Sequence, residues 1–455
     1  MCSRTWGDVT TGAGDGAHET TVVIGNGPAA VHACRALRER GYAGCIRLIS
    51  DHCEPPYNPM LTPYYLAGGI ARAGCFPWGG RELYSSLRVE AHLGVPVVAL
   101  DAQAHTIELA DGARMEYTQC LVAAGASAVV PPVPGLAGPR VFLLRTVRHA
   151  DSLRRALARG ASRALVLGAS MVGLKTAEVL HAAGLEVVLV DLAPHVLSLA
   201  AHESCARLIE THLVEAGVEL RLGEGMAAVE TAAAGGLHVE FTGGPPVDAD
   251  LVVVAVGVRP NLDFIDRGQV ESDVGLIVDD YLRTSAPDLY AAGDVAQATN
   301  LLTGRKEVVG LFANACLQGR TAGRVMAGDE EAYPGSLPCN VIHIMGLTFT
   351  GVGDATTAPV LVERLDSEAG TYCRLSGGEG RPSGVNLLNH RAGGGIVRHV
   401  VTRGARWGRG GGDGGLPAGA DVRVPQRAWA GFCDRLIEHG ILGETSGAPI
   451  AKEGS

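Results

Sequence analysis

A glycine-rich turn near the start of this 455-residue chain has the residue types needed to bind a nucleotide. Val22–Ile24 predicts a short buried strand, and Gly25, Gly27 and Ala30 follow it in the spacing of a dinucleotide fingerprint. The first glycine allows a tight turn, the second lets backbone N–H groups approach a pyrophosphate, and the alanine lets a helix pack closely. The N-terminus of that helix would direct its positive dipole end at the phosphates. The pattern alone is also typical of a turn that binds nothing.

The same arrangement recurs in the middle of the chain. A strand over Ala164–Leu167 leads into a turn that carries Gly168, Ser170 and Gly173, and a helix follows. Asp191 stands at the tip of the next strand, where a carboxylate in such a unit would meet a ribose. Because these features are independent, their joint repeat indicates two dinucleotide sites rather than two idle turns.

Carboxylates at the strand tips indicate which nucleotide each site takes. Asp191 can accept a hydrogen bond from a free ribose 2′-hydroxyl and would repel a 2′-phosphate, and Leu192–Leu199 contains no Arg or Lys. We therefore expect the second site to favour NAD(H) over NADP(H). At the first site Asp51 or Glu54, just past the strand Cys45–Ser50, is expected to contact a ribose, and the sequence leaves open which one does so.

Apolar runs and turn residues predict the elements that must position these turns. Helices are expected over Ala29–Arg40 and Ala313–Met326, and Pro55–Ala67 is expected to cross the face of the first site. Strands are expected over Val97–Leu109 (as short alternating pieces), Gln119–Gly125, Glu186–Val190, Asp250–Val258, Leu289–Ala291, Asn340–Ile344, Val360–Leu365 and Gly384–Leu388. This alternation is typical of an α/β protein, with an α+β region beyond about residue 335.

Composition and charge exclude several classes of protein. The net charge is -10, which argues against a nucleic-acid binder and against a protein of anionic membrane surfaces. We see neither an apolar run long enough to span a bilayer nor a signal peptide. The 11 cysteines form no C-x-x-C pair, which disfavours a zinc site or a disulfide scaffold and suits a reducing cytoplasm. We therefore expect no metal site and a cytoplasmic protein.

At this point the motifs together resemble a known family, the FAD- and NAD(P)-dependent pyridine nucleotide-disulfide oxidoreductases. The resemblance covers roughly residues 20–400 and is nearest the branch of ferredoxin and rubredoxin reductases, NADH oxidases and nitrite reductase flavin modules. The motifs that carry it are GNGPAA at the first turn, LVAAG at Leu121–Gly125, LRT at Leu144–Thr146, GASMVGLKTAE at Gly168–Glu178, VGVRPN around Gly257, and TSAPDLYAAGDV before Ala296.

The resemblance implies two Rossmann-like domains in three layers and a C-terminal α+β interface domain. An FAD-binding domain over 21–140 and 258–335 would be interrupted by an NAD-binding domain over 141–257, and the interface domain would follow over 336–455. Residues 1–20 are expected to be a disordered tail, 403–420 a flexible Gly- and Arg-rich loop rather than a nucleic-acid tail, and 427–439 a final helix. The implied assembly is a homodimer or a subunit of a complex.

The resemblance also assigns residues to each cofactor. Asp294 would bind the flavin ribityl chain, and the helix that carries Asn314 would face the flavin pyrimidine, where its dipole could stabilise negative charge. The residues expected at FAD are Gly25, Gly27, Pro28, Ala29, Ala30, Asp51, Glu54, Ala124, Gly125, Arg145, Gly293, Asp294 and Asn314. Those expected at NAD(H) are Gly168, Ser170, Met171, Val172, Gly173, Asp191 and Gly257.

The chain departs from the family pattern at the redox cysteine. The CxxxxC pair of disulfide reductases is missing, and the single cysteine of thiol-dependent relatives corresponds to Met60. A thioether cannot form a thiolate, a mixed disulfide or a sulfenic acid. Cys53, seven residues earlier, is the alternative redox thiol, and we disfavour it.

Two further departures concern charge. Relatives pair a Lys, at a position near Tyr64 here, with a Glu where this chain has Lys175. Lys175 and Glu178 could form a local helix-face pair or could lie beside the flavin or nicotinamide, and the sequence favours neither reading. His52 occupies the place of the usual ribose-binding Glu.

These features predict an FAD-dependent NADH:acceptor oxidoreductase. NADH would pass a hydride to FAD, and electrons would leave for a ferredoxin- or rubredoxin-like carrier or a partner subunit. The alternatives are an NADH oxidase or thiol/CoA-disulfide-type reductase, which would need Cys53 to act, and a non-catalytic FAD-binding subunit.

Overall fold

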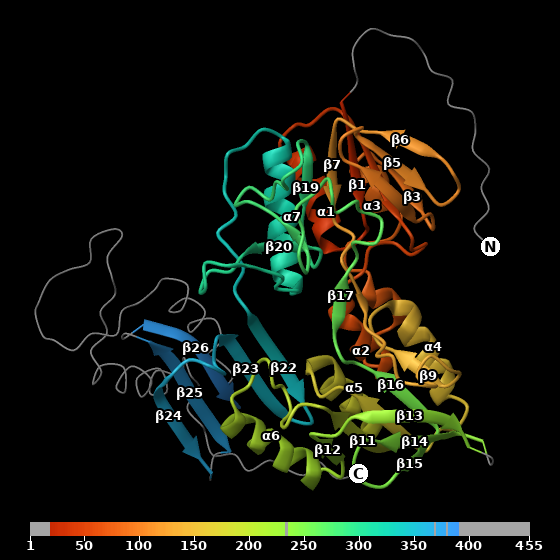
Figure 1. Cartoon of the computed structure of the whole chain (residues 1–455), viewed down its shortest axis with the longest axis vertical. Helices are drawn as coiled ribbons and strands as arrows, with labels where there is room; N and C mark the ends of the chain where they lie inside the picture. Colours follow the sequence, from red (N-terminus) through yellow and green to blue (C-terminus); the bar gives the residue numbers. More distant parts are fainter. Residues whose placement is uncertain (1–18, 233–234, 368–369, 379–380, 391–455) are drawn as a thin grey trace, which may run out of the picture. The chain divides into compact units, whose positions relative to one another are not determined.

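The computed structural model describes residues 19–232, 235–367, 370–378 and 381–390 (Figure 1). Contacts group them into two compact units. One contains the described residues up to Ala128, with Arg145–Val147 and Val258–Ser336; the other contains Val129–Leu144, Arg148–Gly257 and the described residues from Leu337 onward. The predicted loop 403–420, the helix 427–439 and most of the predicted tail lie outside the described residues. The division into three domains stays a prediction.

The first unit is built on a parallel five-stranded sheet with the strand order β19-β7-β1-β2-β3. Parallel strands present their carboxyl ends at one edge, so the turns that follow them meet there. The predicted strand over Cys45–Ser50 is confirmed. The strands are β1 (Thr20–Ile24), β2 (Cys45–Ser50), β3 (Val89–Leu93), β7 (Gln119–Val122) and β19 (Leu289–Ala291).

Helices α1 (Pro28–Glu39) and α7 (Phe312–Met326) lie side by side in this unit (Figure 1). They approach closely because glycines of α7 face the α1 backbone. A Cβ at Gly319 would lie 2.1 Å from the Ala29 carbonyl oxygen, and one at Gly323 would lie 2.4 Å from that of Ala33. Both residue numbers rise together along this contact, so the helices are parallel, and both N-termini face the carboxyl edge of the sheet.

Shorter elements complete the first unit. Short helices follow β2. Three small sheets have the strand orders β4-β5-β6, β17-β8 and β18-β20-β21. Their bounds are η1 (Pro59–Leu61), α2 (Thr62–Leu66), η2 (Arg72–Cys75), α3 (Glu82–Ser86), β4 (Val97–Asp101), β5 (Thr106–Leu109), β6 (Arg114–Glu116), β8 (Ala126–Ala128), β17 (Val258–Pro260), β18 (Leu276–Ile277), β20 (Ala296–Thr299) and β21 (Lys306–Glu307).

The second unit repeats the parallel arrangement, with the strand order β12-β11-β10-β16-β9. A three-stranded antiparallel sheet, β13-β14-β15, packs apolar side chains into the same core. The elements are β9 (Val141–Leu143), α4 (Val147–Leu157), β10 (Arg163–Leu167), α5 (Met171–Ala182), β11 (Glu186–Asp191), α6 (Glu203–Glu215), β12 (Glu219–Leu222), β13 (Met226–Thr231), β14 (Leu237–Phe241), β15 (Val247–Ala249) and β16 (Leu251–Val254).

The described part of the C-terminal region is an antiparallel five-stranded sheet with the order β22-β23-β26-β25-β24. Three of its strands lie where the sequence predicts them, and β23 and β25 were not predicted. The bounds are β22 (Cys339–Ile344), β23 (Leu347–Gly353), β24 (Val360–Asp366), β25 (Thr371–Gly378) and β26 (Arg381–Leu388).

The single strand predicted over Asp250–Val258 is wrong in extent. The chain leaves β16 after Val254 and starts β17 only at Val258, which pairs with β8. Gly257 lies between them at a φ of 123°, a conformation that an extended strand does not allow. The apolar run is therefore interrupted by backbone geometry rather than by polarity.

Candidate functional site

The first glycine turn joins the carboxyl end of β1 to α1. Gly25 has a φ of 118°, and its N–H donates to the Ile49 carbonyl oxygen at 2.7 Å. A Cβ there would lie 2.1 Å from the Ala123 carbonyl oxygen, so only glycine fits. Among the described residues, no atom lies within 4 Å of a Cβ built on Gly27. This opening, at the N-terminus of α1, leaves room for a phosphate group.

The N-terminal part of α7 lies at the same edge of the sheet, beside Gly293. A Cβ on Gly293 would lie 3.2 Å from that of Ala29 on α1 and 3.7 Å from that of Ala315 on α7. Neither of these two described helices has an acidic residue in its first turn. Two unopposed positive dipole ends suit an anion such as a pyrophosphate.

Arg145 and Asp294 form an ion pair beside this turn. Arg145 Nη2 lies 2.6 Å from Asp294 Oδ2, and the two side chains are 30% and 15% exposed. Arg145 Nε also donates to the Ala126 carbonyl oxygen at 3.3 Å. Tyr57 lies near the guanidinium, and burial raises its pKa to about 12 while Arg145 opposes that shift. The structure therefore brings together two residues that are 149 positions apart in the chain.

The loop that follows β2 is tied to the first glycine turn. Asn26 Nδ2 donates to the Glu54 carbonyl oxygen at 3.0 Å, and Tyr84 Oη donates to Asn26 Oδ1 at 3.0 Å. The Asp51 side chain is 63% exposed, while Glu54 lies 3.9 Å from Arg72. Neither contact decides which carboxylate meets a ribose, so that alternative stays open.

Two residues that the sequence did not single out fix turns at this edge. The buried Gln318 of α7 accepts the Gly293 N–H through Oε1 at 2.7 Å. Asn261 donates through Nδ2 to the Ala124 carbonyl oxygen at 2.8 Å, and its N–H donates to that of Gly125 at 3.0 Å. Asn261 lies in the VGVRPN motif, which was the available signal for it. Asn314 is also buried, and its Nδ2 donates to the Val309 carbonyl oxygen at 3.2 Å.

The second glycine turn, after β10, is packed most tightly at its last glycine. Gly168 has a φ of 109°, and a Cβ on Gly173 would lie 1.7 Å from the Gly168 carbonyl oxygen. Ser170 caps α5: its Oγ accepts the Gly173 N–H at 3.4 Å and donates to the Ala255 carbonyl oxygen at 3.0 Å. Met171 and Val172 begin the helix.

Asp191, the last residue of β11, accepts two backbone hydrogen bonds. Its Oδ2 accepts the Ala169 N–H at 2.6 Å, and its Oδ1 accepts the Ala193 N–H at 2.8 Å. The predicted ribose acid therefore also contacts the glycine turn.

Lys175 and Glu178 of α5 form the predicted pair, with Nζ 2.5 Å from Oε2. Both also contact the backbone at the end of β22: Lys175 Nζ donates to the His343 carbonyl oxygen at 3.0 Å, and the Met345 N–H donates to Glu178 Oε1 at 2.9 Å. These contacts favour the interpretation that Lys175 and Glu178 have a structural role at β22.

The sulfur atoms show no arrangement for thiol chemistry among the described residues. Met60 is 58% exposed, and Cys53 is half-buried beside Gly94, where an added Cβ would lie 2.7 Å from the Cys53 sulfur. Burial raises the pKa of Cys34 to about 12 and that of Cys316 to about 11, so both remain thiols at neutral pH. Within the described ranges, no group of three or more His, Cys, Asp or Glu side chains is arranged to hold a metal ion. The same part of the chain holds no helix with the length and apolarity to cross a membrane.

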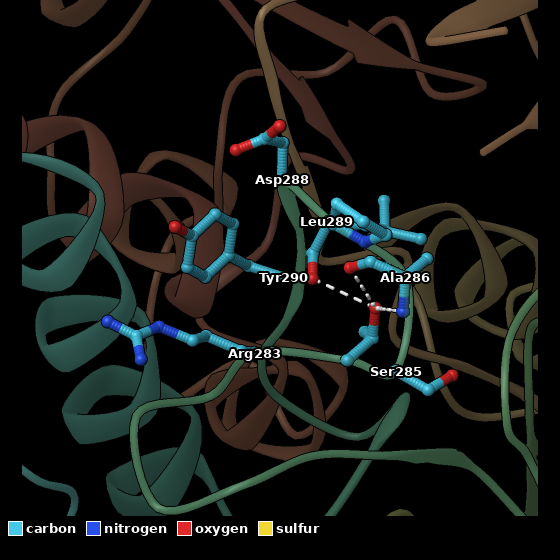
Figure 2. Close-up of a pocket in the computed structure, with 8 residues that line it drawn as sticks. Arg283, Ser285, Ala286, Asp288, Leu289 and Tyr290 are labelled. Atoms are coloured by element: carbon cyan, nitrogen blue, oxygen red, sulfur yellow. Dashed lines mark hydrogen bonds between the residues drawn. The ribbon is translucent and has the colours of Figure 1, made fainter. Parts of the chain in front are cut away.

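A separate pocket lies along Arg283–Tyr290 (Figure 2). Thr284 Oγ1 donates to the Leu289 carbonyl oxygen at 2.9 Å and accepts the Ala286 N–H at 3.2 Å, within the loop that leads into the amino end of β19. The glycine turns follow carboxyl ends of strands, so this pocket lies at the opposite end of β19 from Gly293.

The sequence profile of the pyridine nucleotide-disulphide oxidoreductases matches residues 19–319. The epsilon subunit of an NADH-dependent phenylglyoxylate dehydrogenase from Aromatoleum evansii is 32% identical over 391 residues, which cover 85% of this chain and 92% of that relative. A rubredoxin-NAD(+) reductase from Pseudomonas putida is 29% identical over 348 residues, 76% of this chain and 90% of that relative. The structure of a ferredoxin reductase from Rhodopseudomonas palustris has a TM-score of 0.76 at 26% identity, and the match covers 82% of this chain and 91% of that one.

Proposed function

The chain belongs to the pyridine nucleotide-disulphide oxidoreductase family, and from this premise we propose that it is an FAD-dependent NADH:acceptor oxidoreductase. Members of this family bind FAD and NAD(H). Electrons would pass from NADH through FAD to a protein electron carrier or a partner subunit. The names of a rubredoxin reductase and of a dehydrogenase subunit among the relatives support these two kinds of acceptor.

The observation that carries this proposal is the presence of two glycine turns of the nucleotide-binding type and no arrangement for thiol chemistry in the part of the chain that the structure describes. Position 60, where thiol-dependent relatives keep a cysteine, holds an exposed methionine. Electrons that reach the flavin would therefore leave it directly rather than through a protein sulfur.

The first unit offers the groups that FAD requires. Gly27 leaves the backbone open at the N-terminus of α1, and the N-terminus of α7 adds a second positive dipole for the pyrophosphate. Asp294, held by Arg145, would accept ribityl hydroxyls. When bound, FAD accepts two electrons from NADH and can release them singly.

The second unit would hold NADH in the turn of Gly168 and Ser170, with Asp191 at the adenosine ribose. A carboxylate at that place favours NAD(H), because a 2′-phosphate would bring negative charge against it. Lys175 and Glu178 are assigned a holding role at β22 rather than a proton transfer, since both already contact its backbone.

Anaerobic titration of the flavin-loaded protein with NADH tests the proposal. Bleaching of the flavin absorbance is expected, with NADH acting at much lower concentration than NADPH. Reduction of ferricyanide or a rubredoxin should then exceed oxygen consumption, and Cys53→Ser should leave both rates unchanged. Flavin that does not bleach would leave only a non-catalytic FAD-binding subunit. Loss of activity in Cys53→Ser would favour the NADH oxidase or thiol reductase.

We further propose that the protein acts in the cytoplasm, as a homodimer or within a complex. The scattered cysteines, which form no C-x-x-C pair, support the compartment, and the dehydrogenase subunit among its relatives supports the complex.

A further inference from the structure

The carboxylate of Asp191 joins two segments that would form opposite sides of the NAD(H) site. Ala169 lies in the glycine turn, and Ala193 lies in the loop after β11. Asp191 Oδ2 accepts the N–H of the first at 2.6 Å, and Oδ1 accepts the N–H of the second at 2.8 Å. One side chain therefore bridges the turn and the loop.

Further hydrogen bonds extend this bridge to α6. The Leu197 N–H donates to the Ala169 carbonyl oxygen at 2.9 Å, so the N–H of Ala169 binds the end of β11 and its carbonyl oxygen binds the segment that follows. The Val196 N–H donates to Oε1 of the buried Glu210 at 3.0 Å, and Arg207 Nη1 contacts Glu210 Oε2 at 2.7 Å. The loop is thus fixed to a helix as well as to the glycine turn.

We propose that Asp191 is a positioning residue, in addition to the ribose contact that the proposed function gives it. Its carboxylate sets the spacing between the pyrophosphate turn and the adenosine-side loop. A carboxylate suits both tasks because each oxygen can hold a backbone N–H and still accept a ribose hydroxyl. Asparagine has one oxygen, so its NH2 group would face one of the two N–H donors and leave it without an acceptor.

The test compares NAD+ with an analogue that lacks the adenosine 2′-hydroxyl. Calorimetry measures the affinity of both nucleotides for the flavin-loaded wild type, Asp191→Asn and Asp191→Ser. If Asp191 positions the two segments, Asp191→Asn weakens both nucleotides by about tenfold or more. It also speeds hydrogen exchange at the Ala169 and Ala193 amides without nucleotide, and it raises KM for NADH with little change in kcat.

Asp191→Ser keeps the test usable if the asparagine variant does not fold. A serine hydroxyl can accept the N–H two residues on, at Ala193, but is too short to reach Ala169. It should therefore speed exchange at Ala169 alone and still weaken the 2′-deoxy analogue.

Asp250→Ala is the matched control, because a single Asp250 oxygen accepts both N–H groups and the oxygen of an asparagine could keep them. Asp250 Oδ2 accepts the Ser162 N–H at 2.7 Å and the Arg163 N–H at 2.9 Å, at the opposite end of β10. Its loss should lower the melting temperature and leave NAD+ affinity within about twofold. The positioning role is overturned if the Asp191 variants weaken NAD+ but bind the 2′-deoxy analogue as well as the wild type does. A wild type that binds neither nucleotide would instead defeat the proposed function.

Discussion

The glycine turns after β1 and β10 differ in where their support comes from. Around the first, Asn26 bonds to the chain 28 and 58 residues away. Around the second, Ser170 bonds three residues along the helix and also 85 residues away at Ala255, and Asp191 bonds 22 residues back. The second turn therefore draws on its own strand–helix–strand unit and on one contact after β16, whereas both Asn26 contacts at the first turn come from the chain beyond β2.

The packing between helix and strand also differs between the two turns. The difference lies at the last motif position, where Ala30 has room for its Cβ while a Cβ on Gly173 would lie 1.7 Å from the Gly168 carbonyl oxygen. The last small residue of the motif is alanine in the first turn and glycine in the second. The comparison teaches that the same fingerprint can bring its helix to the strand at different distances, with room for a methyl group in one turn and none in the other.

Gly173→Ala should break the second turn and produce the largest effect. Its Cβ would lie 1.7 Å from a backbone oxygen that cannot move freely, so we expect a loss of about 3 kcal/mol in unfolding free energy. NADH affinity should fall more than about tenfold, measured by titration. The control is Ala30→Gly in the first turn, which should cost only about 1 kcal/mol through helix propensity. Equal effects of the two substitutions would contradict the difference in packing.

Local pattern made much of both parallel sheets predictable. Short apolar runs that end in glycine marked β1, β10 and β19, and a run that ends before Asp51 marked β2, because the strand and the turn are encoded within a few residues. The same logic failed at Gly257, where the apolar run continues but the backbone turns. It also missed β23 and β25, since antiparallel pairing in that sheet depends on partners distant in sequence.

The supports of the first site could not be read from the sequence. The family resemblance assigns Arg145 and Asp294 to FAD separately. The sequence around each residue does not indicate that the two form an ion pair across 149 positions. Gln318 looks like an ordinary helix residue until Gly293 is placed beside it. Asp191 was expected at a ribose, but its two backbone contacts depend on the turn geometry.

Arg145→Leu tests the long-range support of the first site. It leaves the 15% exposed Asp294 carboxylate without its ion-pair partner, at a cost of about 2 kcal/mol. The dissociation constant for FAD, measured by flavin fluorescence, should rise about 30-fold. Arg114→Leu breaks an exposed pair with Glu108 and should cost about 0.5 kcal/mol without altering FAD affinity. Unchanged FAD binding in Arg145→Leu would mean that the pair does not support the site.

Gln318→Leu should have a smaller effect in the same place. The Gly293 N–H would lose its acceptor, which costs about 1.5 kcal/mol and should weaken FAD by about tenfold. Gln297→Leu is a matched control, because buried Gln297 likewise accepts the Gly275 N–H, at 2.9 Å. We expect similar melting temperatures for the two variants and weaker FAD binding only for Gln318→Leu. Equal FAD affinities would remove Gln318 from the support of the turn.

The smallest effect concerns pH and the amino end of β10. The Ser162 and Arg163 N–H groups hold the pKa of Asp250 below its usual value. Because the folded-state pKa is the lower one, this stabilisation is complete above the unfolded pKa of about 3.9 and is lost as pH falls through the folded value. Asp250→Asn should therefore flatten the acid limb of a plot of melting temperature against pH, with NADH affinity at pH 7 unchanged. A wild-type acid limb retained in the variant would show that other carboxylates set it, while reduced NADH affinity would show that both ends of β10 act on the nucleotide turn.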